Sequence, residues 1–137
     1  MTIRVRLLTN HYLCYSANGL QCSGKVKRLS EEEWDLISCM EDEDSSHVAT
    51  ATDCGKLVGW FRMTRVGRNL YAQGTWVAPT HRRQGLAAQL WERALERLNP
   101  ASIDVTVISK GGVALIDHME KAHPEIWWTV EGRRDVQ

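Results

Sequence analysis

The sequence predicts a mixed α/β (α+β) fold in which helices flank a mostly antiparallel sheet. Three extended runs between residues 47 and 79 are separated only by short turns, as in an antiparallel meander. Residues 84–98 then change to the period of an amphipathic helix. A strand, a helix and a last strand follow, and this order of elements indicates one mixed sheet covered by helices.

The N-terminal third is expected to contain extended segments and one helix. Residues 2–8 alternate in polarity as a strand does, and residues 11–16 are a second candidate strand. Ser30 and Glu33 have the spacing of a capping box, which predicts that a helix begins at Ser30. The acids and serines of 41–46 are typical of a solvated loop. The apolar face of the helix would carry Trp34, Ile37 and Met40.

Turn residues and a helix stop divide the rest of the chain. Residues 53–56 and 67–69 have the composition of hairpin turns, and the third extended run ends at Pro79. Asn99-Pro100 ends the helix that starts at residue 84. Its apolar stripe consists of Leu86, Leu90, Ala94 and Leu98, with Ala87, Trp91 and Leu95 beside it. The last three elements are predicted as a strand at 102–108, a helix at 112–123 and a strand at 125–130.

Length, charge and cysteine content exclude several classes of protein. The 137 residues have the size of one domain, so we expect 1–137 to form a single domain. The formal net charge is zero, which disfavours recruitment of nucleic acid or an anionic membrane by a global field. No apolar run approaches the ~20 residues of a membrane helix, and the first residues lack the pattern of a signal peptide, so we expect neither feature. The cysteines form no CxxC pair, so we expect free thiols in the cytoplasm and no metal site: Cys14, Cys22, Cys39 and Cys54.

A basic, glycine-containing turn joins the third extended run to the helix within the segment TWVAPTHRRQGLAAQLW, residues 75–91. The first turn of a helix leaves backbone N–H groups without partners and carries a partial positive charge. Arg82 and Arg83 add charge at this point, and Gly85 lets a ligand approach the backbone closely. The turn therefore predicts a pyrophosphate site, with a merely solvated basic turn as the simpler alternative.

This segment resembles the signature of the GCN5-related N-acetyltransferases (GNAT), Arg/Gln-x-x-Gly-x-Gly/Ala, which reads RRQGLA at residues 82–87. The resemblance covers about residues 47–122 and is weak before residue 46. It implies that acetyl-CoA is the co-substrate and lies between two splayed strands. The first of these strands ends at 76–77, and the second spans 102–108. The residues it assigns to the cofactor are Trp76, Val77, Arg82, Arg83, Gln84, Gly85, Leu86 and Ala87.

The resemblance also implies direct transfer of an acetyl or short acyl group to an amine, on a small molecule or a protein. An amine with a pKa near ~10.4 needs a base or a desolvated pocket to be nucleophilic at pH 7. The CoA thiolate, with a conjugate-acid pKa of roughly 8.5, is a tolerable leaving group. No cysteine nucleophile is needed, and a second copy of the chain is a possible partner.

The catalytic residues match the family less well than the cofactor turn does. The family pattern N-x-x-A-x-x-x-Y-E-K corresponds to KGGVALIDHMEK, which has no tyrosine. One alignment places Met119 at the tyrosine position and another places His118 there. We take His118 as the candidate proton donor, with a surface or packed histidine as the alternative. The identity of the general base is left open, because the central strands are expected to offer no carboxylate. The candidates are Tyr71, Gln73, Thr75, His47, Asp53 and the acids of 41–44.

Six tryptophans are many for a chain of this length. Trp34, Trp60 and Trp91 fall at expected core positions, and Trp76 lies beside the expected cofactor groove. Trp127-Trp128 could edge an acceptor pocket or belong to the core.

Two other functions compete with an acetyltransferase. A CoA-binding module without turnover would keep the basic turn and lack the tyrosine and the base, as this chain does. A nucleic-acid-binding protein is disfavoured because interleaved aromatic residues and net positive charge are missing. Its arginines would be Arg62, Arg65, Arg68, Arg82 and Arg83.

Overall fold

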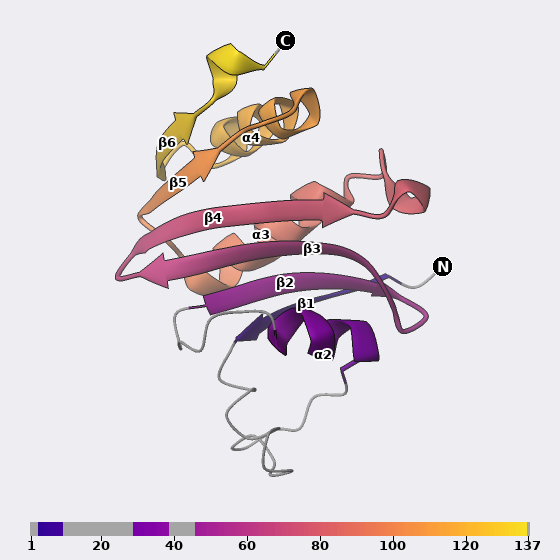
Figure 1. Ribbon diagram of the computed structural model, residues 1–137. Coiled ribbons are helices and arrows are strands. Elements are labelled where there is room, and N and C mark those ends of the chain that lie inside the picture. Colours follow the sequence, from indigo (N-terminus) through magenta and orange to yellow (C-terminus); the bar gives the residue numbers. More distant parts are fainter. Residues whose placement is uncertain (1–2, 10–28, 39–45, 137) are drawn as a thin grey trace.

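A computed structural model describes residues 3–9, 29–38 and 46–136, and in this part of the chain six strands form one sheet in the order β1-β2-β3-β4-β5-β6 (Figure 1). The strands are β1 (Ile3–Thr9), β2 (Ser46–Asp53), β3 (Lys56–Val66), β4 (Asn69–Val77), β5 (Ser102–Thr106) and β6 (Trp127–Glu131). The helices are α2 (Glu31–Ser38), α3 (Leu86–Leu98) and α4 (Lys110–Ala122), with 3-10 turns η2 (Pro79–His81) and η3 (Arg133–Asp135).

The sheet confirms the predicted mixed, mostly antiparallel arrangement. Strands β1 to β4 pair antiparallel, whereas β5 pairs parallel with β4 and β6 pairs parallel with β5. Both predicted hairpin turns are present, and the first places Cys54 and Gly55 at φ values of 51° and 83°. The candidate strand at 11–16 and most of the predicted loop at 41–46 lie outside the described residues, although Ser46 belongs to β2.

Element ends differ from the predictions by a few residues. Helix α4 begins at Lys110 rather than at residue 112, because the Ser109 hydroxyl accepts a hydrogen bond from the Gly112 N–H at 3.0 Å and caps the helix. Strand β5 ends at Thr106, and β6 runs from Trp127 to Glu131.

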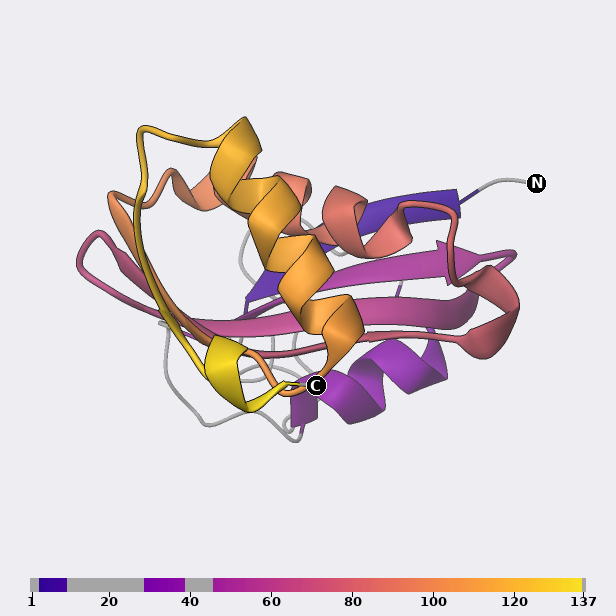
Figure 2. The ribbon, with the colours of Figure 1, turned by 90° about the horizontal axis from the view of Figure 1, so that it is seen from above.

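Helices cover both faces of the sheet. Helices α3 and α4 lie on one face and α2 on the other, as Figure 2 shows from above. The apolar stripe of α3 packs on the sheet as predicted, with Leu86, Leu90, Trp91, Ala94, Leu95 and Leu98 all buried. The Trp91 ring stacks on Phe61 at a centroid distance of 4.0 Å, and its Nε1–H donates to the Thr75 hydroxyl at 2.9 Å. Trp60 is partly buried beneath α2, against Leu8 and Val48.

The predicted capping box of α2 is confirmed. The Glu33 N–H donates to the Ser30 hydroxyl at 3.1 Å, and the Ser30 N–H donates to Glu33 Oε1 at 3.0 Å. The fully buried Glu33 carboxylate also accepts from the Thr50 hydroxyl at 2.6 Å and pairs with Arg6. These bonds tie α2 to β1 and β2. The side chains of Trp34 and Ile37, and Met40, lie outside the described residues.

His123, at the C-terminal end of α4, links that helix to α3. Its ring bonds Glu92 at 2.7 Å and Glu125 at 3.3 Å. Burial lowers the pKa of His123, but the hydrogen bonds and charges of Glu92 and Glu125 outweigh burial and raise it above 6.5. A raised folded-state pKa adds stability that is fully present below the unfolded pKa and is lost as pH rises through the folded one.

We therefore expect His123→Gln to lower the melting temperature most below pH 6.5, with the difference from wild type shrinking as pH rises. Melting curves of both proteins between about pH 5.5 and about pH 8.5 measure this difference. A difference that is independent of pH would contradict the ion-pair account of this contact.

No helix within the described ranges is long and apolar enough to span a membrane. Cys54 is a free, exposed thiol, and the other three cysteines lie outside the described residues.

Candidate functional site

Strands β4 and β5 form a fork. They pair only where Asn69–Tyr71 faces Ser102–Asp104, and β5 then turns away from β4 (Figure 1). A register shift against β3 leaves Gln73 as an extra, bulged residue just beyond the last pair. A bulge bends a strand and increases its twist. The two central strands are therefore splayed, as the family resemblance implies.

The edge of β4 that faces the fork does not pair with β5 beyond Tyr71. The Ala78 N–H donates to the Val58 carbonyl at 2.8 Å, so this residue faces β3. Because alternate residues of an antiparallel strand face opposite neighbours, Val77 and Thr75 direct their backbone groups into the fork. The Val77 carbonyl accepts from Arg82 Nε at 2.9 Å, which folds the basic turn back onto β4. An extended ligand can pair with this edge as a further strand would.

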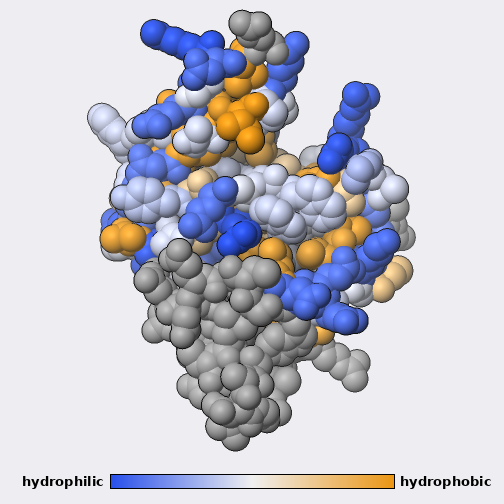
Figure 3. All heavy atoms as spheres, viewed as in Figure 1, coloured by the Kyte–Doolittle hydropathy of each residue, from blue (hydrophilic) through white to orange (hydrophobic). Residues whose placement is uncertain are grey.

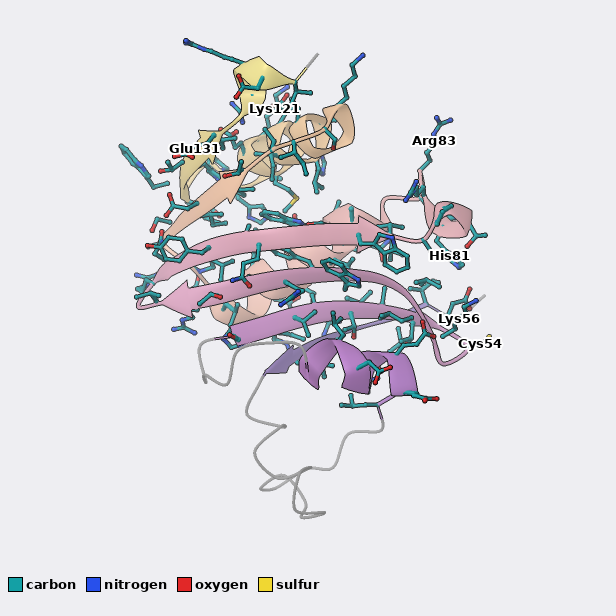
Figure 4. The ribbon with its side chains drawn as sticks, in the orientation of Figure 1. Cys54, Lys56, His81, Arg83, Lys121 and Glu131 are labelled. Carbon is teal, nitrogen blue, oxygen red and sulfur yellow. The ribbon has the colours of Figure 1, made fainter. Side chains whose placement is uncertain are left out.

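The basic turn presents backbone donors at the start of α3. Gly85 is the N-cap residue at φ 74°, Arg83 lies at φ 63°, and no side chain caps the helix. Left-handed residues in such a turn make successive N–H groups converge into an anion-binding concavity. A Cβ built on Gly85 would meet no atom within 4 Å, so the space in front of the turn is open. Arg83 makes no hydrogen bond or ion pair within the described part of the chain, and Figure 4 shows it extending from the turn.

One cleft of about 690 Å³ joins the fork, the turn and the N-terminal half of α4. It is lined by seven of the eight residues predicted for the cofactor, namely Trp76, Val77, Arg82, Arg83, Gly85, Leu86 and Ala87. Gln84 is exposed and its side chain does not line the cleft. Arg62, Arg65 and Arg68 do not line it either.

The far wall of the cleft comes from the start of α4, which the sequence reasoning did not assign. The additional lining residues include Ser109, Gly111, Gly112, Ala114 and Leu115. Small residues in the first turn of a helix leave room for a ligand beside it. The Gly-Gly pair after Ser109 was the available sequence signal.

His81 was also missed as a lining residue. Its Nε2 bonds Asp53 at 2.8 Å, and its Nδ1 bonds the Thr80 hydroxyl at 2.8 Å. The hydrogen bond from His81 is the main reason why the pKa of Asp53 lies below its usual value. This pair holds the η2 turn against the β2–β3 hairpin. Asp53 thus positions His81 and does not itself line the cleft.

Of the two alignments for the family tyrosine, one gives a side chain that reaches the cleft. Met119 is fully buried in the core, whereas His118 is exposed and lines the cleft one turn after Ala114. Of the two alignments, the one that uses His118 therefore places a side chain at the cleft.

The candidate bases are spread over the molecule. Thr75 lines the cleft, but its hydroxyl accepts from Trp91. His47 is buried with only 7% exposure, and burial, followed by the charge of Arg65, lowers its pKa. Tyr71 is 45% exposed at the apex of the fork, and Gln73 is exposed beside it. The acids of 41–44 lie outside the described residues.

The expectation that the central strands carry no carboxylate was wrong, because Asp104 lies on β5, although it does not line the cleft. Asp104 on β5 pairs with Tyr71 at the apex of the fork and accepts from the Asn69 amide at 3.0 Å. The alternating polar residues Ser102, Asp104 and Thr106 were the signal that could have found it.

Trp127 and Trp128 do not line the cofactor cleft, and Trp128 packs against the core, which is one of the two places expected for this pair. Trp127 is 76% exposed, and Trp128 stacks on Trp91 at 6.2 Å. Within the described ranges, no three His, Cys, Asp or Glu side chains are placed to hold a metal ion.

The profile of the acetyltransferase (GNAT) family matches residues 14–115. Solved structures of similar fold include a GNAT-family acetyltransferase from Streptococcus pneumoniae TIGR4, at 20% identity over 86% of each chain with a TM-score of 0.56. Another is the ribosomal-protein-S18-alanine N-acetyltransferase of Escherichia coli, at 16% identity over 86% of this chain and 76% of that one, with a TM-score of 0.55. AAC(6')-Iy in complex with the bisubstrate analogue CoA-S-monomethyl-acetylneamine aligns at 14% identity over 89% of each chain, with a TM-score of 0.51. A comparison with curated proteins finds no significant match.

The family match begins well before residue 46, where the sequence resemblance is weak, and it ends within α4. At these identities the solved structures establish the fold alone. Family match, sheet order and splayed strands agree, and the chain belongs to the GNAT family of acetyltransferases.

Proposed function

We propose that this protein is an N-acetyltransferase that moves an acetyl or short acyl group from acyl-CoA directly to an amine. The observation that carries the proposal is the cleft in which the open edge of β4 meets the uncapped start of α3. An extended chain that ends in a pyrophosphate matches these two features together.

The residues present fit acetyl-CoA. The backbone N–H groups between Arg83 and Ala87 would hold the pyrophosphate, with Arg83 adding charge. The backbone of Thr75 and Val77 would pair with the pantetheine arm. The thioester, which supplies the acyl group and its leaving thiolate, then lies in the fork beside β5.

The residues of the chain would position the two substrates and donate a proton, and none of them would act as a nucleophile. In direct transfer, the amine nitrogen attacks the thioester carbonyl, the C–N bond forms, the C–S bond breaks and the nitrogen loses a proton. His118 would give a proton to the departing thiolate from the α4 side of the cleft. GNAT-fold proteins that act on amines, such as the ribosomal-protein-alanine acetyltransferase of Escherichia coli, support an amine acceptor here.

Thiol release tests the function. Purified protein with acetyl-CoA and a panel of amines should release free CoA only when both substrates are present, and the acetylated amine should be detected by mass spectrometry. Tight binding of acetyl-CoA without release of CoA in the presence of any amine would indicate a CoA-binding module rather than an enzyme.

His118→Ala should lower kcat about a hundredfold, the low end of the usual contribution of a general acid, because the thiolate is already a tolerable leaving group. The affinity for acetyl-CoA should not change. His118→Tyr should restore much of kcat by returning a proton donor. Lys121→Ala is the matched control, since Lys121 is exposed on the same helix and does not line the cleft (Figure 4). Equal rates for His118→Ala and wild type at all pH values would remove His118 from the chemistry.

A further inference from the structure

A second groove of about 440 Å³ lies on the opposite face of the sheet from α3, between α2 and strands β3 and β4. Its lining residues are Glu32, Asp35, Leu36, Leu57, Trp60 and Trp76. Figure 3 shows this face, where apolar patches over the strands lie directly above hydrophilic side chains at α2. The groove is thus aromatic on one side and acidic on the other.

The aromatic side of the groove is built from two tryptophans on neighbouring strands. Trp60 pairs with Trp76 across β3 and β4, and their rings stack at a centroid distance of 6.4 Å with 29° between the planes. A Cβ built on Gly74 would lie 3.4 Å from the Trp60 ring, so the ring lies against β4 at this residue. The Trp76 side chain keeps 36% of its surface exposed. Ring faces of tryptophan attract cations.

The acidic side of the groove comes from α2. Glu32 and Asp35 are both exposed residues of this helix. Glu32 Oε1 accepts from the Leu57 N–H at 3.3 Å, which holds this carboxylate beside β3. Carboxylates beside indole rings favour an ammonium group over a neutral or anionic one.

Trp76 connects the groove to the cofactor cleft, because it lines both. We propose, on the basis of the proposed acetyltransferase function, that the groove binds a second positive charge of the acceptor amine. The acceptor is then a polyamine cation that crosses β4 at Trp76 and places its reacting nitrogen in the fork.

The sheet sets the spacing between the two nitrogens of the acceptor. Trp60 stands on β3, and the fork lies on the far side of β4. Neighbouring strands are about 4.8 Å apart, so two strand spacings separate the charges by about 10 Å. Long diamines reach this distance, whereas short ones do not.

The test compares 1,8-diaminooctane with 8-amino-1-octanol, which has the same length and one charge, and with 1,3-diaminopropane. We expect kcat/KM for the long diamine to exceed that of both others by about tenfold. Glu32→Gln keeps an oxygen acceptor for the Leu57 N–H. This variant and Trp60→Leu should each lower the ratio of kcat/KM for the long diamine to that for the amino alcohol about fivefold. Glu31→Gln is the matched control, because it removes a charge from the same helix turn outside the groove.

Calorimetric binding of 1,8-diaminooctane to the protein without acetyl-CoA decides the proposal even where turnover is absent. Binding that weakens in Glu32→Gln and not in Glu31→Gln supports it. Equal kcat/KM values and equal binding for the diamine and the amino alcohol would overturn the polyamine proposal. Release of CoA with either amine would still support the acetyltransferase function. An absence of acetyl-CoA binding and of CoA release would instead count against the acetyltransferase.

Discussion

Gly85→Glu is expected to raise the Kd for acetyl-CoA at least about a hundredfold, because it blocks several charge-assisted hydrogen bonds and places a negative charge where the pyrophosphate binds. Gly85 lies at φ 74° at the start of α3, and its Cβ would project into open space of the cleft. Isothermal calorimetry with acetyl-CoA measures the effect directly.

A matched variant separates blocked binding from backbone strain. Gly67 in the β3–β4 turn also has a positive φ, 61°, and a Cβ there would likewise meet no atom within 4 Å. Gly67→Glu therefore introduces the same charge and a similar strain of about 1 kcal/mol, far from the cleft. It should destabilise the fold about as much as Gly85→Glu and leave the Kd unchanged. Equal Kd values for both variants and wild type would show that the turn does not bind the cofactor.

Trp91→Ala is expected to lower the free energy of unfolding by about 3–5 kcal/mol, the range for truncation of a large buried aromatic residue. Trp91 is 2% exposed, stacks on both Phe61 and Trp128, and donates to Thr75. Such a loss is a large part of the about 5–15 kcal/mol that stabilises a typical domain. Urea unfolding followed by circular dichroism measures it.

Trp127→Ala is the control for this core prediction. Its side chain is 76% exposed, so its removal should change stability by no more than about 0.5 kcal/mol. Trp91→Phe keeps an aromatic ring against Phe61 and removes the donor to Thr75, so its cost should fall between the two. Equal stabilities for Trp91→Ala and Trp127→Ala would contradict the packing described for α3.

Local signals in the sequence predicted most of the fold. The meander, its two turns and α3 followed from period, turn residues and the Asn99-Pro100 stop, because each of these signals acts within a few residues. The capping box predicted the start of α2 for the same reason. The start of α4 was placed two residues late, since the Ser109 cap was not considered.

The site could be predicted only in part. Residues 82–87 carry a motif with a backbone mechanism, and all but Gln84 line the cleft. His81 and the start of α4 come together in the cleft only through the sheet order and the fork, which no local pattern reports. Asp104 lies at the apex of the fork and does not line the cleft. The sequence left the place of Trp127 and Trp128 open, because an aromatic residue in a predicted strand carries no sign of which face it occupies.

The melting temperature with and without acetyl-CoA, with ATP as the anion control, tests the central claim that the cleft at the start of α3 is a CoA site. For a Kd of about 10 µM, about 1 mM ligand adds roughly 2.7 kcal/mol of stability. For a domain of this size we expect a rise on the order of 5 to 10 °C that ATP does not reproduce. No rise at saturating acetyl-CoA, or an equal rise with ATP, would contradict it.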